Sequence, residues 1–328
     1  MREASDLKIG ILANEASWYF RDLERAALSR GFACRRLDFE RLVARTGAGG
    51  SRISVVQPPQ DAVTGTTATR PEGGEPGAPS LKTFSRETSS DELASFDVII
   101  VRTMPPGSLE QVVYRMDVLG RLEAAGTRVV NSPKSLECAV DKYLTTARLQ
   151  AAGLPVPETI VCEHEEDAMA AFEHLGRDVV VKPLFGAEGR GIVRVSDPDM
   201  ALRVFRTLMR LQAVLYLQRF VDHEGFDVRV LVLDGQVLGG IRRRSPHDFR
   251  TNVSRSAIAE PHSVTSRESD FALRAAEATG TFIAGVDLLY DRQGNCYVIE
   301  VNAVPGWQAF SRTTSIDVAQ RLIDRLET

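Results

Sequence analysis

Two apolar segments near the C-terminus carry oxygen ligands at positions that a hairpin would bring together. Residues 285–290 (GVDLLY) and 296–302 (CYVIEVN) flank a short turn and are rich in Val, Leu and Tyr. Glu300 and Asn302 are two residues apart and share one face of a strand, while Asp287 lies in the facing strand within reach. Carboxylates in apolar surroundings are costly without a partner, and a hard cation such as Mg²⁺ is the usual remedy. The pattern alone predicts either a metal site or two solvated acids on an edge hairpin.

A second apolar stretch ends in Lys182 and precedes a glycine-rich loop at residues 186–191 (GAEGRG). Gly186, Gly189 and Gly191 let backbone amides approach phosphate oxygens, which Lys182 can neutralise. The loop lacks the GK[ST] ending of a Walker motif, and no helix opens directly after it as in a dinucleotide fingerprint. These residues predict either a phosphate-binding loop or a plain glycine-rich turn.

Two further segments could complete such a site. Residues 215–221 (LYLQRFV) predict a strand that leaves a lobe, where free backbone groups and an apolar wall could hold adenine. Arg242, Arg243 and Arg244, together with residues 248–252 (DFRTN), place cationic and amide donors on or beside a hairpin. Such donors suit an anionic transition state, although any one of these arginines could equally be an exposed strand end.

The first part of the chain predicts a parallel α/β sheet, because apolar strand and helix patterns alternate along it. We expect strands at 8–13, 32–37, 97–102 and 128–131, and helices at 17–29 and 109–125. Residues 46–80 hold seven glycines and five prolines with few large apolar residues. Such a composition cannot bury enough surface to offset its ordering entropy, so we predict a flexible insertion over 46–95.

The rest of the chain predicts a linking helix and two further lobes. The helix pattern covers residues 135–152, where Gly153 and Pro155 are stop signals. A smaller unit follows, with strands at 159–162, 178–183 and 192–195 and helices at 165–175 and 198–211. Beyond 215 the pattern is strand-rich, with hairpin turns at 234–235 and 291–294. We therefore divide the chain into a domain at 1–134, a helical link and central domain at 135–214, and a C-terminal domain at 215–328.

The composition narrows the function classes. A formal charge of −4 gives no electrostatic footprint for polyanions, so nucleic acid is not an expected partner. No signal peptide or membrane span is evident, which favours a cytoplasmic protein without a membrane partner. The four cysteines form no CxxC pair, and the five histidines form no ligand-spaced pair, which argues against disulfide and zinc frameworks. Lysine occurs at only five positions, and two of them, Lys142 and Lys182, fall in the segments that matter below.

In this order the segments resemble the ATP-grasp superfamily, and more narrowly its RimK-like alpha-L-glutamate ligase family. The resemblance rests on the motifs Asn131-Ser132-Pro133, Asp141-Lys142, Val181-Lys182, residues 186–191, residues 248–252, Gly285-Val286-Asp287 and residues 300–306. It implies an α/β fold with an N-terminal pre-ATP-grasp domain, a small central lid domain and a C-terminal domain, with ATP between the last two. It also implies an ATP-dependent ligase that joins a carboxylate to an amine through an acyl phosphate, with Mg²⁺ as the metal and Mn²⁺ as the alternative.

The resemblance also assigns roles to residues of this chain. Lys142 and Lys182 match lysines that contact the nucleotide, and Asp227 matches an acid on the ribose side. The hinge beside adenine commonly has a glutamate where this chain has Arg219, which departs from the family pattern. The full set is Lys182, Arg244 and Arg250 for catalysis; Lys142, Lys182, Gly186, Glu188, Gly189, Gly191, Gln218, Arg219, Phe220, Asp227, Arg250 and Asn252 for the nucleotide; and Asp287, Glu300 and Asn302 for the metal.

The substrates stay open at this level. We expect small-molecule partners: ATP, an amino acid and a carboxylate acceptor, which would be a pterin-type cofactor or a protein C-terminus. The preferred amine is L-glutamate, because arginine forks suit its carboxylates. A ligase for another amino acid, of the lysine-biosynthesis or peptide-ligase type, is the alternative, and so is a non-catalytic nucleotide-binding regulator. Retention of Asp287, Glu300 and Asn302 speaks against the regulator, the lack of GxGxxG speaks against a dehydrogenase, and a homo-oligomer is left open.

Overall fold

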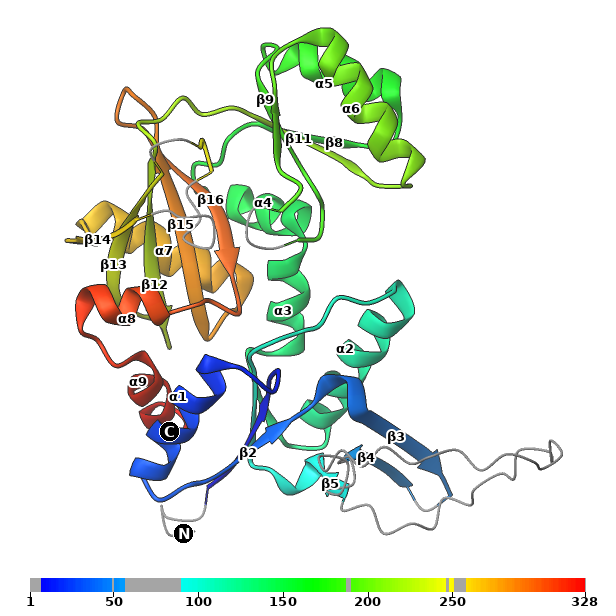
Figure 1. The fold of residues 1–328 in the computed structure, drawn as a ribbon, viewed down its shortest axis with the longest axis vertical. Helices are drawn as coiled ribbons and strands as arrows, with labels where there is room; N and C mark the ends of the chain where they lie inside the picture. Colours follow the sequence, from blue (N-terminus) through cyan, green and yellow to red (C-terminus); the bar gives the residue numbers. More distant parts are fainter. Residues whose placement is uncertain are drawn as a thin grey trace, which may run out of the picture.

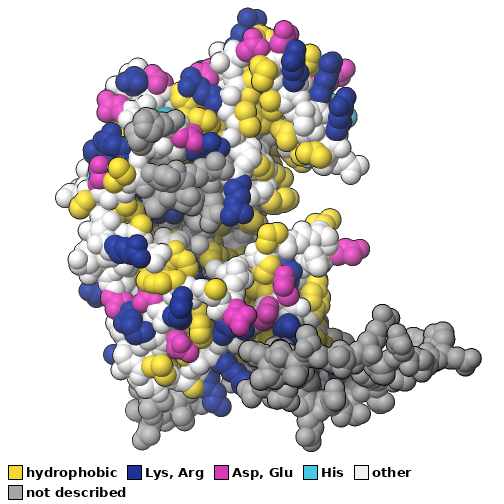
Figure 2. Space-filling model, viewed as in Figure 1, with side chains coloured by type: hydrophobic (Ala, Val, Ile, Leu, Met, Phe, Trp, Pro, Cys, Tyr) yellow, Lys and Arg dark blue, Asp and Glu magenta, His cyan; other side chains and the backbone are white. Residues whose placement is uncertain are grey.

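Three lobes follow one another along the long axis of the protein (Figure 1). The structure is a computed structural model that describes residues 7–48, 50–56, 90–186, 190–245, 248–250 and 258–327. The predicted site residues Glu188, Gly189 and Asn252 lie outside this described part, as do residues 57–89 of the predicted insertion. In the space-filling view the surface is indented between the upper lobe and the N-terminal lobe, with apolar side chains along the edges (Figure 2).

The N-terminal lobe contains the predicted parallel sheet, with strand order β2-β1-β6-β7. Its strands are β1 (Lys8–Leu12), β2 (Ala33–Leu37), β6 (Val98–Val101) and β7 (Arg128–Val130), and its helices are α1 (Trp18–Ser29) and α2 (Leu109–Ala124). The chain runs from β1 to β2 on one side and returns through β6 to β7 on the other. The carboxyl ends of β1 and β6 therefore meet where the strand order reverses, which is the usual ligand position in such sheets.

The insertion differs from the sequence-based expectation at both ends. A second, antiparallel sheet has the order β3-β4-β5, with β3 (Leu42–Gly47), β4 (Gly50–Val56) and β5 (Ser90–Glu92), flanked by 3₁₀ turns at Phe39–Arg41 and Leu93–Ser95. Ile53 and Val55 alternate with exposed or half-buried residues and are buried in the same core as Leu93. The prediction of flexibility over all of 46–95 was therefore wrong here, because the short alternation was hidden in a Gly/Pro-rich average.

The predicted helix at 135–152 is two helices, α3 (Pro133–Val140) and α4 (Lys142–Ala151). Asp141 has an extended backbone, and its carboxylate accepts the N–H of Leu144 at 3.0 Å. An aspartate in this position starts a new helix, since its side chain satisfies an N–H that has no partner in the first turn. The break places Lys142 at the start of α4, and Lys142 faces the lid lobe described next.

The lid lobe is the uppermost one in Figure 1 and has its own core around Phe172, Phe205 and Leu217. Its sheet has the order β10-β9-β11-β8, covered by α5 (Glu165–His174) and α6 (Pro198–Arg210). The strands are β8 (Thr159–Cys162), β9 (Val179–Lys182), β10 (Val193–Val195) and β11 (Leu215–Arg219). Because β11 pairs with both β8 and β9, the sheet continues past the expected domain boundary at 214/215.

The C-terminal lobe is a five-stranded antiparallel sheet with order β14-β13-β12-β15-β16. The strands are β12 (Phe226–Leu233), β13 (Gln236–Arg244), β14 (Ile258–His262), β15 (Ile283–Tyr290) and β16 (Cys296–Asn302). Helix α7 (Ser266–Thr279) packs on one face of this sheet, whereas Leu231, Leu233 and Ile283 on the opposite face belong to the core that includes α1. The expected hairpins are present, whereas β14, α7 and the short helices α8 (Gln308–Thr314) and α9 (Val318–Asp324) were not predicted.

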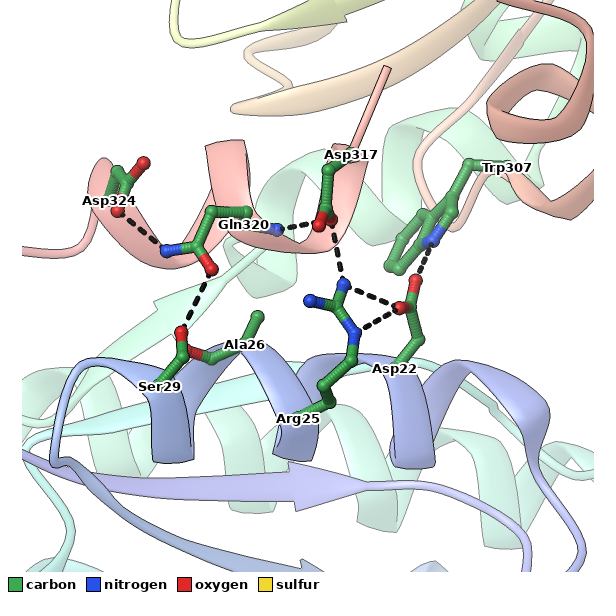
Figure 3. A network of polar contacts seen from close by, with 8 residues as sticks. All are labelled: Asp22, Arg25, Ala26, Ser29, Trp307, Asp317, Gln320 and Asp324. Carbon is green, nitrogen blue, oxygen red and sulfur yellow. Dashed lines mark hydrogen bonds and ion pairs between the residues drawn. The ribbon is translucent and has the colours of Figure 1, made fainter. Parts of the chain in front are cut away.

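The two ends of the chain pack together. Helix α9 lies along α1, and its Leu322 and Ile323 share one core with Leu23 and Ala26 of α1 (Figure 3). Polar contacts flank this core, because Arg25 binds Asp317 at 2.8 Å and the hydroxyl of Ser29 donates to Gln320 at 3.0 Å. The same core continues into β12, β13 and β15, so the N-terminal and C-terminal lobes are packed as one base beneath the separate lid. In the described part of the chain, no helix is long and apolar enough to cross a membrane.

The buried side chains of β4 give a direct test of the second sheet. We expect Ile53→Ala to lower the free energy of unfolding by about 2–5 kcal/mol, because it removes a buried side chain and leaves a cavity. The neighbouring exposed variant Arg52→Ala should stay within about 0.5 kcal/mol of the parent. Urea denaturation measures both changes, and equal effects of the two variants would show that this strand is not part of the core.

Candidate active site

A cleft of about 870 Å³, counting the space open to solvent, lies between the lid sheet and the C-terminal sheet. Its walls include ten of the predicted site residues: Lys142, Lys182, Gly186, Gln218, Arg219, Phe220, Asp227, Arg250, Asp287 and Glu300. Gly191, Arg244 and Asn302 do not line it. The four sequence segments, which are far apart along the chain, therefore do converge on one cavity.

The two lysines enter the cleft from different elements. The ammonium of Lys142, at the start of α4, donates to the carbonyl of Gly186 at 2.7 Å. The ammonium of Lys182, at the end of β9, donates to the side-chain oxygen of Gln218 on β11 at 2.7 Å. Burial lowers the pKa of both, and that of Lys182 falls to about 8 although the carboxylate of Glu300 favours its charged form. Neither ammonium group forms an ion pair with a carboxylate within the part of the chain that the structure describes, so both could bind phosphate oxygens.

The two acids lie opposite each other on adjacent strands. Asp287 on β15 pairs in register with Glu300 on β16, and the ladder shifts directly after Asp287. A bulge of this kind lets neighbouring residues turn to the same side, and both Ile299 and Glu300 line the cleft. Among the residues described, the carboxylate of Glu300 has no hydrogen bond or ion pair with protein. It faces the cleft with its charge uncompensated by a direct contact.

Asp287 is held by two arginines. Arg229 on β12 forms a fork to it, with Nε and Nη2 each 2.7 Å from a carboxylate oxygen, and Nη2 of Arg243 on β13 lies at 2.8 Å. Burial disfavours ionisation of Asp287, yet the charges of Arg229 and Arg243 hold its pKa below the usual value. Arg243 also binds the carboxylate of Asp227 through Nε at 2.7 Å and through Nη2. Asp227, Arg243 and Asp287 thus form a buried, fully charged row under the cleft.

These residues fit a divalent cation. Glu300 has free carboxylate oxygens, and Asp287 retains lone pairs beyond those used by its arginines. Asn302 lies on the same face, since it pairs with Gly285 two positions from the Asp287–Glu300 pair, and its side-chain oxygen accepts the N–H of Val304 at 2.9 Å. Oxygen ligands of this type suit Mg²⁺ shared with phosphates. In the described residues, no group of three or more His, Cys, Asp or Glu side chains could hold a metal ion by itself, so phosphate or water would have to complete the shell.

The three consecutive arginines cannot act together. Side chains alternate along a strand, and Arg243 points to the face that carries Asp287, whereas Arg242 and Arg244 point to the face covered by α7. Arg244 stacks on Phe226 and approaches Glu260 at 3.7 Å. Its catalytic assignment stays a prediction, and the structure gives it no contact with the cleft.

Arg250 lies in the cleft but is bound to its neighbour Asp248, at 2.6 Å in the shortest contact. The short segment around it is held from the hinge side by His223, which the sequence did not single out. His223 accepts the N–H of Gly225 at 3.1 Å and bonds to the backbone of Phe249, whose ring lies edge-on to Phe220. Nothing in the sequence marked His223, because its contacts are set by two loops that meet only in the folded protein.

The hinge beside the expected adenine differs from the prediction in one respect. The backbone N–H groups of Arg219 and Phe220 are not free, since they donate to the backbone carbonyls of Glu158 and Asp178 at 2.8 and 2.9 Å. The next N–H, that of Val221, has no partner within the described residues, and Val221 lines the cleft. Arg219 stands where the resemblance led us to expect a glutamate, and its side chain forms an ion pair with Glu158.

Comparisons with known proteins agree with this arrangement. Residues 139–326 match the family model of the RimK-like ATP-grasp domain, and residues 22–137 match that of the prokaryotic glutathione synthetase N-terminal domain.

The chain is 31% identical over 263 residues to tetrahydromethanopterin:alpha-L-glutamate ligase of Methanosarcina acetivorans, covering 72% of this chain and 81% of the relative. It is 29% identical over 254 residues to a probable alpha-L-glutamate ligase of Haemophilus influenzae, covering 76% and 82%. The solved structure of the ATP-grasp ligase PsnB with a phosphomimetic variant of its minimal precursor, Mg and ADP has a TM-score of 0.66 at 22% identity, over 98% of each chain. The predicted ATP-grasp fold is thereby confirmed.

The lowered pKa of Lys182 predicts how nucleotide binding depends on pH. A bound triphosphate favours the ammonium form and raises this pKa, so ATP affinity should fall as pH rises through about 8, by up to about tenfold per pH unit, with proton uptake on binding. Lys182→Arg keeps the charge and should flatten this dependence, while the exposed variant Lys134→Arg should not alter it. Calorimetric titration in buffers of different ionisation enthalpy measures both quantities. A flat profile for the parent protein between pH 7 and 10 would contradict the assignment of Lys182.

Proposed function

This chain belongs to the RimK-like ATP-grasp family of ATP-dependent carboxylate–amine ligases, and we propose that it uses Mg²⁺·ATP to add L-glutamate to a carboxylate acceptor. The observation that supports the proposal most strongly is the charge arrangement of the cleft. Two lysines and Arg250 stand across from two paired acids, one of which, Glu300, has no protein partner among the described residues. Such a set complements a triphosphate that carries a divalent cation.

Each part of the cleft has a place in the reaction. Lys142 and Lys182 would bind phosphate oxygens, and the apolar walls with the Val221 N–H would hold the adenine ring. Arg250 would exchange its contact with Asp248 for the phosphoryl group that is being transferred. Asp287, Glu300 and Asn302 would hold Mg²⁺, whose charge would offset the negative charge of the phosphates.

The chemistry has two balanced steps. An oxygen of the acceptor carboxylate forms a bond to the γ-phosphorus while the bond to the β-phosphate oxygen breaks, giving an acyl phosphate and ADP. The nitrogen of the amine then attacks the acyl carbon, loses a proton and expels inorganic phosphate, which leaves an amide. No side chain of the protein forms a covalent bond, so its residues act by position and charge.

The substrates proposed here rest on the relatives and on charge. The protein from Methanosarcina acetivorans is named a tetrahydromethanopterin:alpha-L-glutamate ligase, and that from Haemophilus influenzae a probable alpha-L-glutamate ligase. The acceptor would accordingly be a pterin-type cofactor with a free carboxylate or a protein C-terminus. Arg244, which the sequence suggested for a contact with glutamate, points to the sheet face opposite the cleft, so this contact stays a prediction that the proposal does not rest on. Mn²⁺ is proposed to replace Mg²⁺.

Product analysis tests this proposal. Protein, ATP and Mg²⁺ are incubated with glutamate, aspartate, lysine or glycine and with either a carboxylate-bearing pterin or a peptide with a free C-terminus, and products are weighed by mass spectrometry. We expect a glutamyl increment on one acceptor together with stoichiometric ADP and phosphate. Faster incorporation of lysine or glycine would contradict glutamate as the amine, and ADP formation without any amide product would contradict the ligase assignment.

The two acids should respond differently to neutralisation. Glu300→Gln should abolish Mg²⁺-dependent ADP release with little change in stability, because its carboxylate contacts no described protein group. Asp287→Asn should abolish release and also lower stability, since it leaves Arg229 and Arg243 buried with less countercharge. Coupled ADP assays and thermal melts separate these effects. Wild-type rates in either variant would remove that residue from the metal site.

A further inference from the structure

Asn131 makes four hydrogen bonds to the strands that carry the acids, although it belongs to the N-terminal lobe. It follows β7 and is 1% exposed. Its side-chain nitrogen donates to the carbonyls of Ile283 and Ala303 at 2.7 and 2.5 Å, and its oxygen accepts the N–H groups of Phe282 and Ile283 at 2.6 and 3.0 Å. Both hydrogens and both lone pairs of the amide are therefore used. The side chain bridges the start of β15 and the end of β16.

The ladder between these strands is short where the acids lie. Only three register pairs, Gly285–Asn302, Val286–Val301 and Asp287–Glu300, stand between the bulge after Asp287 and the ends of the strands. The bulge interrupts the regular hydrogen bonding, so the longer part of the β15–β16 ladder beyond it does not fix the strand spacing at these three pairs. Asn131 closes the open side, next to Asn302, and thereby sets the distance between the two strands.

Arg102 holds the same region from the neighbouring strand. It follows β6 and is 5% exposed, and its Nη2 donates to the carbonyl of Pro305 at 2.9 Å. Its guanidinium lies 4.1 Å from the ring centre of Trp307 and 4.8 Å from that of Tyr19, so it is stacked as well as hydrogen-bonded. Among the described residues it has no carboxylate within ion-pair distance. Its contacts with Pro305 and Trp307 therefore hold in place the segment at residues 303–307, which follows β16.

That segment rests directly on the metal-binding strands. Pro305 covers Gly285, since a Cβ at Gly285 would lie 3.0 Å from the Cβ of Pro305. Two residues on, the indole of Trp307 donates to Asp22 of α1 at 2.9 Å (Figure 3). Residues 303–307 are thus held between β15 and three elements of the N-terminal lobe. Movement of the N-terminal lobe would shift this segment and the strand end that it continues.

We propose that Asn131 and Arg102 are positioning residues that keep Asp287, Glu300 and Asn302 at the spacing Mg²⁺ requires; this inference rests on the metal site of the proposed function. Mg²⁺ needs near-octahedral geometry with bonds of about 2.0–2.1 Å, so a small change in strand spacing is costly to its binding. Contacts to the nucleotide from β9 and β11 belong to the lid sheet and do not depend on this spacing. The N-terminal lobe therefore contributes to metal affinity without touching the metal.

Binding measurements separate this role from general destabilisation. ADP is titrated calorimetrically into Asn131→Ala, Arg102→Met and Arg102→Lys, with EDTA and with Mg²⁺, after thermal melts have verified folding. We expect ADP affinity in EDTA to stay within about twofold of the parent, and Mg²⁺ affinity of the ADP complex to fall by roughly 10–100-fold in Asn131→Ala and Arg102→Met. Arg102→Lys can still donate to Pro305 and should lose less.

A matched control is Ser135→Ala. Ser135 is equally buried and donates to the carbonyl of Gly280, but among the described residues its side chain makes no hydrogen bond to β15 or β16. Its loss should leave Mg²⁺ affinity unchanged, and a fall as large as that in Asn131→Ala would overturn the positioning role. If Asn131→Ala does not fold, Mg²⁺ affinity is compared between Arg102→Met, Arg102→Lys and Ser135→Ala instead. A loss in Arg102→Met no larger than that in Ser135→Ala would then overturn the positioning role.

Glu300→Gln distinguishes the two levels of the proposal. If Glu300→Gln loses Mg²⁺ binding while folded Asn131→Ala and Arg102→Met retain it, the positioning role is wrong and the proposed function stands. If Glu300→Gln also binds Mg²⁺ like the parent, the metal site itself is misplaced and both proposals fail.

Discussion

The buried guanidinium of Arg243 is the interaction on which the rest of the site depends. It lies between Asp227 and Asp287, which are on two different strands, and all three side chains are almost completely excluded from solvent. A carboxylate in this position would otherwise take up a proton or stay out of the core, because an unpaired buried charge is expensive. Removal of one partner from such a group typically costs about 3–5 kcal/mol. Arg243 therefore keeps Asp287 ionised and oriented before any ligand arrives.

The division of the molecule into a base and a lid follows from its cores. The N-terminal and C-terminal lobes share one continuous core, whereas the lid packs around its own. The acids and their arginines belong to the base, while Lys182, Gln218 and the glycine-rich loop belong to the lid. The cleft is thus formed by two separately packed bodies: the base brings the acids together with Lys142 and Arg250, and the lid brings Lys182. A nucleotide bound in this cleft would contact both bodies, with its phosphates near the lysines and its cation near the acids.

The sequence predicted which segments line the cleft better than it predicted the contacts among their residues. The hairpin at 285–302 and the lysine before the glycine loop were recognisable because residue type, strand period and spacing agreed. The fork from Arg229 to Asp287 and the bonds of Asn131 were not predictable, since they join residues 58 and more than 150 positions apart. The sequence suggested that the three consecutive arginines form one cluster. Side chains alternate along β13, so Arg244 lies on the face opposite Arg243, and only the strand register shows this. The break at Asp141 was missed because a cap and a helix interior differ in backbone conformation, which periodicity does not record.

We propose that Asp287 and Glu300 hold a divalent cation on the base, opposite Lys182 of the lid. The most direct test is anomalous diffraction from crystals of the protein grown with Mn²⁺ and ADP. We expect an anomalous peak from Mn²⁺ at about 2 Å from carboxylate oxygens of both Asp287 and Glu300, and in contact with a phosphate of ADP. A cleft that contains ADP but shows the peak elsewhere, or no peak, would contradict it.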